Sequence, residues 1–465
     1  MKRVKKSKSI EFKEDHPEFE KDKKLEHLKE KARKVSILEG GFASASGGFG
    51  NRYIIPFALA LNATNVHIGL LTSFSNLLSP IGQLLGSKLM QNHSRKKLVV
   101  WFVFFQALMW LPLAFLGYLF YKGVFVEYLP IVLVFLYAIL VAFGGIAYPS
   151  WFSWMGDLVS EKKRGKYFGR RNKFSASAGL ISALLAAFLL DVFETKGFVL
   201  LGFAVLFGIA FTFRTISSML FRKQFSPKFK LKKGDYFSFW NFIKTFDNFG
   251  KFAFYQAFFY FSIMIASPFF AVYMLEELNF SYITFTLVTM SSILFYILFL
   301  PLVGKFSDKF GNVKLFYLEA ALAVTYPLFW IFLKNPIALI FLPQLVAGIM
   351  SAAGVIAANN FIYESVSRQH RPICSTYKNL LLGIGISLGA ILGGFLTKVA
   401  PASFSSVFFF VFLVSAVGRF AVPIIFLPYL KEERKVKYLP HMHLDINHPM
   451  HFVSQEASWL KKVFR

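Results

Sequence analysis

Residues 304–314 read GKFSDKFGNVK, and this short polar stretch separates two long apolar runs, 283–303 and 315–333. Each run has about the 20 residues that an α-helix needs to cross the hydrocarbon core of a bilayer. Gly311 can adopt the positive φ that a tight turn between two antiparallel helices requires. The stretch therefore predicts a helical hairpin in a membrane, with a charged turn at one surface.

The alternation of apolar runs and short polar stretches continues through most of the 465 residues. Apolar residues make up 55% of the chain and charged residues only 17%, against roughly 25% in soluble domains. The single cysteine, Cys374, permits no internal disulfide. A soluble globular protein, a disordered chain and a disulfide-rich secreted module are thereby excluded. Because the sequence has no phosphate-binding GxxxxGK[ST] loop, we expect neither ATP-driven transport nor a cofactor.

Twelve apolar runs can be delimited, six on each side of a basic segment near the middle of the chain. They predict an all-α polytopic membrane protein with twelve transmembrane helices. The expected spans are 36–61, 68–90, 98–121, 129–156, 172–193, 197–220, 252–275, 283–303, 315–333, 337–363, 378–397 and 405–430. The expected domains are a basic N-terminal tail (1–34), an N-terminal six-helix bundle (35–220), a basic linker (221–251), a C-terminal six-helix bundle (252–430) and a C-terminal tail (431–465).

The net charge of +27 follows this layout. Short loops and the linker, on the side of the two tails, carry 25 Lys and Arg residues, whereas the opposite loops carry only Lys122, Lys196, Lys334 and Lys398. Because positively charged loops stay in the cytoplasm, we expect both termini there and the protein in the plasma membrane. The charge then reflects topology and contact with anionic lipids of the inner leaflet, and we expect no nucleic-acid partner.

The two tails carry weaker signals. Pro17 and frequent Lys–Glu pairs four residues apart predict a short solvated helix, which we expect to lie near the lipid headgroups. A partner-binding arm is the alternative. The C-terminal tail places His441, His443, His448 and His451 close together, a composition that can bind a metal ion. A solvated tail without metal is the simpler interpretation.

The turn at 304–314 resembles the G-x-x-x-D-[RK]-x-G-x-[RK]-[RK] signature of the major facilitator superfamily, through Gly304, Asp308, Lys309 and Gly311. The resemblance implies that Asp308 accepts hydrogen bonds from the start of the fifth helix, around residues 170–172, where the helix dipole favours an anion. We therefore interpret these residues as a conformational latch.

The equivalent turn after the second span keeps the first glycine and the basic end but has Met90 in place of the acid and His93 in place of the second glycine. A second repeat follows the fourth and tenth spans, where an acid is followed by Arg seven residues later and by Asn after fifteen. The residues of this repeat are Asp157, Arg164 and Asn172 in one half and Glu364, Arg371 and Asn379 in the other, and we add the two acids and the two arginines to the latch. The repeat predicts two pseudo-symmetric bundles.

The resemblance implies a secondary transporter that works by alternating access. Two six-helix bundles would enclose a site near the membrane midplane and open it to each side in turn. The first, fourth, seventh and tenth helices would line the cavity, and the second, fifth, eighth and eleventh would form the interface between the halves. We expect the protein to act as a monomer.

Arg52 is the main candidate for solute recognition. It lies roughly 24 Å from the cytoplasmic end of its span at 1.5 Å per residue, and no acid lies one helical turn away. Because charge in hydrocarbon is costly, such a residue is a functional candidate, and a guanidinium suits carboxylate or phosphate. A hydrogen bond to backbone carbonyls is the structural alternative. Arg419 is similarly deep, and we expect it to have a packing role; Arg214, nearer the cytoplasm, can extend toward the headgroups.

Other polar and aromatic residues on the expected cavity helices complete a candidate pocket, each with ordinary packing as its alternative. They are Asn51, Tyr148, Trp151, Tyr260, Ser262 and Asn359. Glu39 is the candidate for proton coupling, since its helix is expected to line the cavity, and Glu319 lies at a comparable depth. Uniport or another coupling ion remains open.

These features predict a secondary transporter of a small solute with an anionic or electronegative group. No pair of nucleophile and base stands out in the sequence, so we do not expect an enzyme, although a membrane-embedded transferase is one alternative. A transport-inactive receptor or scaffold on the same fold is the other, because fold does not determine function.

Overall fold

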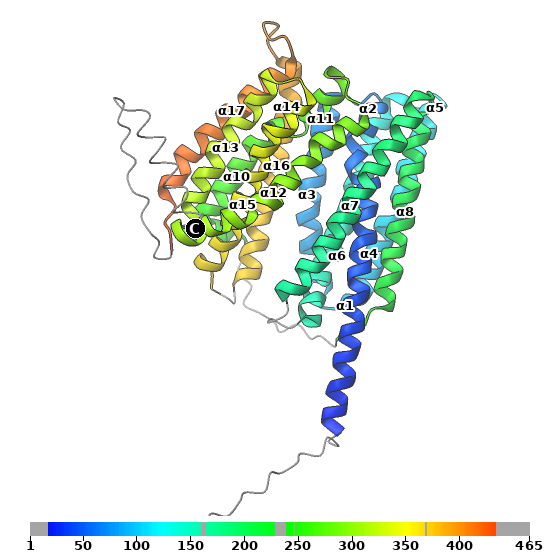
Figure 1. Cartoon of the computed structure of the whole chain (residues 1–465), viewed down its shortest axis with the longest axis vertical. Helices are drawn as coiled ribbons and strands as arrows, with labels where there is room; N and C mark the ends of the chain where they lie inside the picture. Colours follow the sequence, from blue (N-terminus) through cyan, green and yellow to red (C-terminus); the bar gives the residue numbers. More distant parts are fainter. Residues whose placement is uncertain (1–16, 160–163, 228–238, 246, 368–369, 434–465) are drawn as a thin grey trace, which may run out of the picture.

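A computed structural model of the chain describes residues 17–159, 164–227, 239–245, 247–367 and 370–433. In this part of the chain, eleven helical segments are long and apolar enough to cross a membrane. The remaining expected span, the first in the sequence, is less apolar because its helix begins in the charged tail. The structure thus agrees with the predicted all-α architecture (Figure 1).

The first six spans form one bundle in which α3 packs on α6, and α1 packs on α7 and α8. The spans are α1 (Pro17–Phe49) with η1 (Asn51–Tyr53) and α2 (Ile54–Ala60), α3 (Asn65–Leu89), α4 (Arg95–Leu108) with α5 (Trp110–Tyr121), η2 (Val126–Tyr128) with α6 (Leu129–Leu158), α7 (Arg164–Thr195) and α8 (Val199–Lys223).

The second bundle repeats this arrangement, with α10 packed on α16 and α17, and α15 packed on α12 and α13. Its spans are α10 (Asn248–Ala266) with α11 (Phe269–Val272) and the π-helix η4 (Tyr273–Glu277), α12 (Tyr282–Phe310), α13 (Asn312–Phe332), α14 (Pro336–Phe341) with α15 (Pro343–Ser365), α16 (Arg371–Val399), and α17 (Val407–Phe426) with η5 (Leu427–Tyr429).

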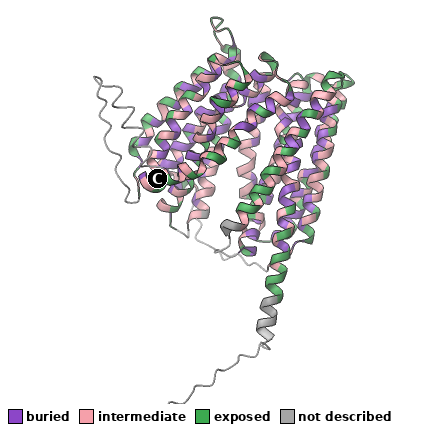
Figure 2. Cartoon of the chain, in the orientation of Figure 1, coloured by how far each residue is buried: buried purple, intermediate pink, exposed green. Residues whose placement is uncertain are grey.

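The helix expected from Pro17 in the N-terminal tail is present, but it is continuous with the first span. Helix α1 runs without a break from Pro17 to Phe49, and its first part projects away from the bundle (Figure 1). The physical reason is local, since residues 30–38 contain neither Gly nor Pro to end the helix. Figure 2 shows this helix from Lys24 onward as mainly exposed at first and increasingly buried in the following turns. Residue 34 is therefore not a structural boundary.

The segment between the two bundles also differs from a simple linker. It contains the short helix α9 (Phe239–Thr245), whose Phe239 and Phe242 rings pack against Tyr377 of α16. Centroid distances of 5.3 and 5.7 Å place these rings in contact. We call this side of the molecule the linker end and the opposite side the far end.

The clusters of buried side chains are arranged differently at these two ends. One core cluster joins both halves and includes Phe57 and Phe203 of the first bundle with Phe269 and Phe285 of the second. A second cluster belongs only to the C-terminal half, and a third, around Trp154, only to the N-terminal half. The two halves therefore share a core toward the far end and have separate cores toward the linker end.

Candidate functional site

Asp191 of α7 joins the two halves at the far end. Its carboxylate oxygens accept hydrogen bonds from the backbone N–H groups of Tyr282 (2.7 Å) and Ile283 (3.2 Å), in the first turn of α12. An anion at a helix N-terminus satisfies donors that lack an intrahelical partner and interacts favourably with the helix dipole. Asp191 thus holds α7 against α12.

Tyr53 forms a second contact between the halves. Its hydroxyl donates to the carbonyl oxygen of Ala183 (2.5 Å) and lies 2.8 Å from the hydroxyl of Thr286 on α12. Between α3 and α16, small residues permit close approach of the backbones, because a β-carbon at Gly69 or Gly394 would overlap the facing helix. The far end is closed by these contacts.

Arg52 lies at an interruption of the first span. Helix α1 ends at Phe49, and a β-carbon at Gly50 would overlap the Trp110 ring, so glycine permits the close packing there. After this break, the partly buried Arg52 donates from Nη1 to the hydroxyl of Thr289 on α12, at 3.1 Å. In the described part of the chain it forms no salt bridge. Its guanidinium therefore contacts the other half while keeping most of its donors available.

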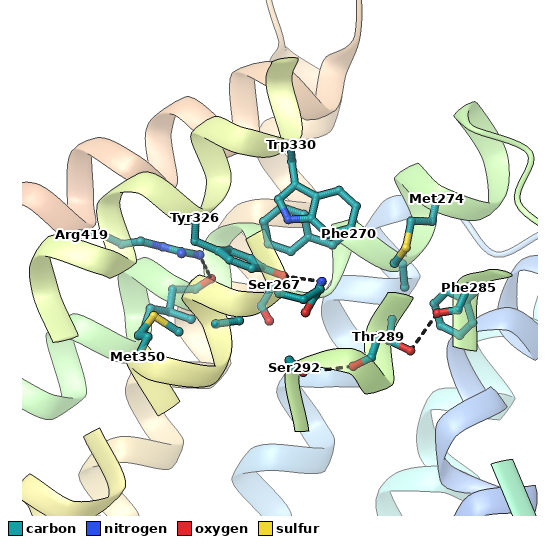
Figure 3. A pocket seen from close by; sticks show the side chains of 14 residues that line it. Ser267, Phe270, Met274, Phe285, Thr289, Ser292, Tyr326, Trp330, Met350 and Arg419 are labelled. Carbon is teal, nitrogen blue, oxygen red and sulfur yellow. Dashed lines mark hydrogen bonds between the residues drawn. The ribbon is translucent and has the colours of Figure 1, made fainter. Parts of the chain in front are cut away.

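A cavity of about 280 Å³ lies beyond Thr289, within the C-terminal half. Figure 3 shows Thr289 and Ser292 of α12 on one side of it and Arg419 with Tyr326 on the other. No acidic side chain lines this cavity. Its wall combines aromatic rings with hydrogen-bond donors and consists of Ile263, Ser267, Phe270, Ala271, Met274, Phe285, Thr289, Ser292, Tyr326, Trp330, Gln344, Ala347, Met350 and Arg419.

The candidate Glu39 lies in a different place, in a buried charged cluster toward the linker end. Its carboxylate accepts hydrogen bonds from Arg171 (3.1 Å) and from the Ser217 hydroxyl (2.9 Å). The Arg171 guanidinium also lies 4.9 Å from the Trp151 ring centroid, and Trp151 neighbours the exposed Tyr148. In this state the Glu39 carboxyl is the anionic partner of an arginine.

The candidate pocket residues therefore do not form one group. Asn51 is exposed beside Arg52, whereas Glu39 precedes Arg52 by about 20 Å of helix at 1.5 Å per residue, and Tyr148 and Trp151 lie near Glu39. The other three lie in the C-terminal half: Tyr260 is partly buried on α10, Ser262 is buried where its carbonyl oxygen accepts from Ser415 of α17, and Asn359 is exposed on α15.

Arg214 is a correction to the sequence-based prediction. Instead of extending toward the headgroups, it donates to Gln106 Oε1 (2.9 Å) and to the Ser217 hydroxyl (3.2 Å) inside the bundle. The reason is that these acceptors and the Glu39 carboxylate lie within its reach. Arg419 is packed as expected, and it donates to the carbonyl oxygens of Ala323 and Ile263.

Comparison with known proteins identifies the family. The sequence matches the Major Facilitator Superfamily over residues 40–245 and 252–460. The chain belongs to this superfamily. It is a multi-pass membrane transporter rather than an enzyme, and the predicted family and fold class are confirmed.

Individual relatives of this superfamily member are distant. Tetracycline resistance protein, class B, of Escherichia coli is 30% identical over 107 residues, which is 23% of this chain. The match covers 26% of that protein, so it spans about a quarter of the length of the relative.

Solved structures agree with the fold over nearly the whole chain. A mutant of the nucleoside transporter NupG has a TM-score of 0.62 at 16% identity and covers 87% of this chain and 100% of its own. A bacterial homologue of the iron transporter ferroportin in its inward-facing state has a TM-score of 0.63 at 14% identity. The match covers 86% of this chain and 99% of that homologue. A bacterial homologue of the lysosomal transporter Spinster has a TM-score of 0.55 at 14% identity. The match covers 94% of this chain and 98% of that homologue.

The repeated acids anchor equivalent corners of the two halves of this transporter. Asp157, near the end of α6, accepts from Arg95 (2.7 Å), and Glu364, near the end of α15, accepts from Asn312 (2.8 Å). Arg95 and Asn312 are each the first residue of the third span of their half. The acids thus hold neighbouring helices of one half together. These contacts support the pseudo-symmetry predicted from the sequence repeat.

The basic partners in the repeat are placed unequally. Arg371 donates to the carbonyl oxygens of Tyr363 (2.8 Å) and Val366 (3.0 Å), and so satisfies acceptors at the end of α15. Arg164 begins α7, and its side chain lies outside the described part of the structure. The repeated Asn172 is exposed on α7.

The turn at 304–314 shapes the linker end of the C-terminal half. Gly311 has φ +96°, as expected for the tight turn, and Gly304 of α12 faces Ile356 of α15. The Lys309 ammonium lies 5.6 Å from the Phe310 ring centroid. Asp308 is exposed at this end, and Arg171, expected near it, binds Glu39 of its own half. This arrangement matches the separation of the two cores at the linker end.

The four tail histidines, His441, His443, His448 and His451, lie outside the described residues. Among the residues that are described, no group of three or more His, Cys, Asp or Glu side chains is arranged to hold a metal ion.

Sequence reasoning missed the residues that join the halves. Asp191, Tyr53 and Thr289 lie on separate spans, and their pairing depends on how α7 and the first span meet α12. One signal was present, since Asp191 is an acid close to the end of an otherwise apolar run.

Proposed function

We propose that this transporter carries a small solute whose anionic or electronegative group binds Arg52 where the two halves meet. The observation that carries the proposal is the contact from Arg52 Nη1 to Thr289, which places a guanidinium of one half beside the cavity of the other. A solute group held by Arg52 would contact both halves at once. Its binding can therefore be linked to their relative movement.

The distribution of contacts supports alternating access. Asp191 and Tyr53 close the far end, while the linker end has separate cores in the two halves. Opening one end and closing the other requires the contacts of Asp191 to break and new ones to form near Asp308. The Asp157 and Glu364 anchors hold neighbouring helices together within each half, which would allow each half to move as a rigid body.

We further propose that the linker end faces the cytoplasm of a plasma-membrane protein, so that the structure is inward-facing. Support comes from 25 basic residues in the loops and linker of this end against four at the other. The basic segments would contact anionic lipids of the inner leaflet, and the protein would work as a monomer without a nucleic-acid partner.

This orientation predicts the accessibility of the far-end loops. Single cysteines placed at Lys122, Lys196, Lys334 and Lys398, in a Cys374→Ser background, should react with a membrane-impermeant maleimide added outside intact cells. A cysteine at exposed Lys88, at the linker end, should react only after the membrane is permeabilised. Protection of any two far-end sites in intact cells would refute the orientation.

The names of the similar proteins refer to nucleosides, iron and tetracycline, so they do not agree on a cargo. The charge of the solute is instead tested with matched pairs, each a carboxylate and its uncharged amide. Proteoliposomes containing the purified protein should take up at least one carboxylate, and at least tenfold faster than its amide. Equal uptake within every transported pair would contradict recognition of an anionic group.

The same assay separates a transporter from a receptor on this fold. A receptor would bind the carboxylate, seen as a rise in the thermal unfolding temperature, without accumulating it inside the vesicles. Uptake with and without a pH gradient also tests Glu39 as the proton-coupling residue. A dependence on the gradient that disappears in Glu39→Gln would support that role.

A further inference from the structure

Two arginines, the partly buried Arg214 and the fully buried Arg419, occupy equivalent positions in the two halves. Arg214 lies on α8 and Arg419 on α17, each the last span of its half. Each donates to the third span, since Arg214 Nε lies 2.9 Å from Gln106 Oε1 on α4 and Arg419 Nη1 lies 3.0 Å from the carbonyl oxygen of Ala323 on α13. The halves can therefore be compared at this position, side chain by side chain.

The N-terminal arginine has an anionic neighbour in the protein. Ser217 accepts from Arg214 Nη1 at 3.2 Å and donates to the Glu39 carboxylate at 2.9 Å, so the hydroxyl bridges the two charges. The charges also interact directly through space. A cation that is removed from water is stabilised by such a counter-charge.

The C-terminal arginine, Arg419, has no anionic neighbour of this kind among the described residues. Arg419 is 1% exposed, and it donates hydrogen bonds to neutral acceptors: the Ser415 hydroxyl (3.0 Å) and the carbonyl oxygens of Ala323 (3.0 Å) and Ile263 (3.1 Å). No acidic side chain forms a salt bridge with it in the described part of the chain. These contacts use three of the five N–H groups of a guanidinium. A buried positive charge with spare donors is left beside the cavity.

The cavity wall next to Arg419 offers further donors. The indole Nε1 of Trp330 is fully buried and forms no hydrogen bond of normal geometry among the described residues, although the Tyr326 side chain lies close enough to interact with it. Tyr326 lies between this ring and Arg419, with its ring centroid 5.8 Å from the guanidinium carbon, and its hydroxyl is 3.4 Å from Gln344 Nε2 (Figure 3). A buried donor without a full hydrogen bond destabilises the protein, so a ligand acceptor here would be favourable.

We propose that this cavity binds the carboxylate of a compact organic anion, with Arg419 as the counter-charge and Trp330 Nε1 as an additional donor. The apolar body of the ligand would pack against Phe270, Phe285 and Met350. A volume of about 280 Å³ is near the lower limit of small-molecule sites, which restricts the ligand to a small one. The inference rests on the proposed function, because it names the solute class and a second binding element for it.

Arg52 and Arg419 then have distinct roles at the same cavity. Arg52 reaches the Thr289 side from the N-terminal half, whereas Arg419 is fixed within the C-terminal half. Arg419 would bind the anion whichever end of the transporter is open. Arg52 would contact the anion only when the two halves meet as they do in this structure. The carboxylate of the bound solute would thus provide for Arg419 the negative charge that Glu39 provides for Arg214.

The test uses benzoate and benzamide, which share a compact aromatic body and differ in charge. Binding to the purified full-length protein is measured by calorimetry. Wild-type protein should bind benzoate at least tenfold more tightly than benzamide, and Arg419→Gln should lose this preference. The matched control is Arg214→Gln, which removes the equivalent arginine outside the cavity. This variant should retain the preference for benzoate over benzamide.

Further variants keep the test decisive if Arg419→Gln does not fold. Trp330→Phe retains the aromatic ring and removes only the donor, and it should weaken benzoate binding by about threefold to tenfold while leaving benzamide binding unchanged. A wild-type protein without preference for benzoate, or a folded Arg419→Gln or Trp330→Phe that keeps wild-type affinity for it, would overturn the proposal. Normal carboxylate uptake by Arg419→Gln alongside inactive Arg52→Ala would refute this cavity site and leave the proposed function standing.

Discussion

Arg52→Ala is expected to reduce the initial rate of carboxylate uptake roughly 30- to 100-fold. A hydrogen bond to a charged group contributes about 1.5–3 kcal/mol, and each 1.4 kcal/mol corresponds to a tenfold change in affinity. Arg52→Lys keeps the charge but loses the planar pair of donors that suits a carboxylate, so it should retain part of the uptake. The rates are measured in proteoliposomes with matched protein content.

Two controls separate recognition from folding in this experiment. Each variant must elute as a single species and unfold at a temperature close to that of the wild type. Lys122→Ala removes a positive charge at the far end without touching the cavity, and its uptake should be unchanged. If folded Arg52→Ala transports the carboxylate with wild-type rate and KM, Arg52 has a structural role only.

Asp191→Ala is expected to shift the protein toward a state open at the far end by roughly tenfold or more. The substitution removes two charge-assisted hydrogen bonds to the first turn of α12, and such bonds contribute more than neutral ones. Asp191→Asn keeps an acceptor but no charge, so its shift should be smaller. The measurement is the rate at which a cysteine at Ser292, in the cavity wall, reacts with maleimide added from the far side.

Glu194→Ala is the matched control for this prediction. Glu194 is an exposed acid near the end of the same helix, and the two N–H groups at the start of α12 are bound by Asp191 instead. Its removal should leave the labelling rate close to that of the wild type. Equal rates in Asp191→Ala and Glu194→Ala would show that Asp191 does not hold the far end closed.

The spans and turns were predictable because they depend on local sequence. Runs of apolar residues gave the helices, and Gly311 has the positive φ that the turn required. The tail helix was predicted, but its continuity with the first span was missed for a local reason as well, since a change in polarity at Val35 does not by itself end a helix. Only residues that disfavour helical dihedrals would do so.

The site was less predictable because it depends on contacts between distant spans. Trp330 and Tyr326 lie on α13 and Arg419 on α17, the ninth and twelfth spans, which are not among the helices that the family resemblance implies for the cavity. Their aromatic rings do not stand out in a chain with 60 Phe residues. Only the packing of α10, α12, α13 and α15 shows that they line one cavity. Arg52 could be singled out because a charge in an apolar run is rare in any membrane span.

The coupling of solute binding to movement of the two halves is tested most directly by distances between spin labels on α7 and α12 or just beyond their ends. One pair, at Asn172 and Lys305, reports on the linker end, and the other, at Lys196 and Asn279, reports on the far end; all four residues are exposed. Adding the transported carboxylate in a Cys374→Ser background should shorten the first distance and lengthen the second, with no such change for its amide. Distances that stay fixed at both ends, or change in the same direction, would contradict alternating access driven by this solute.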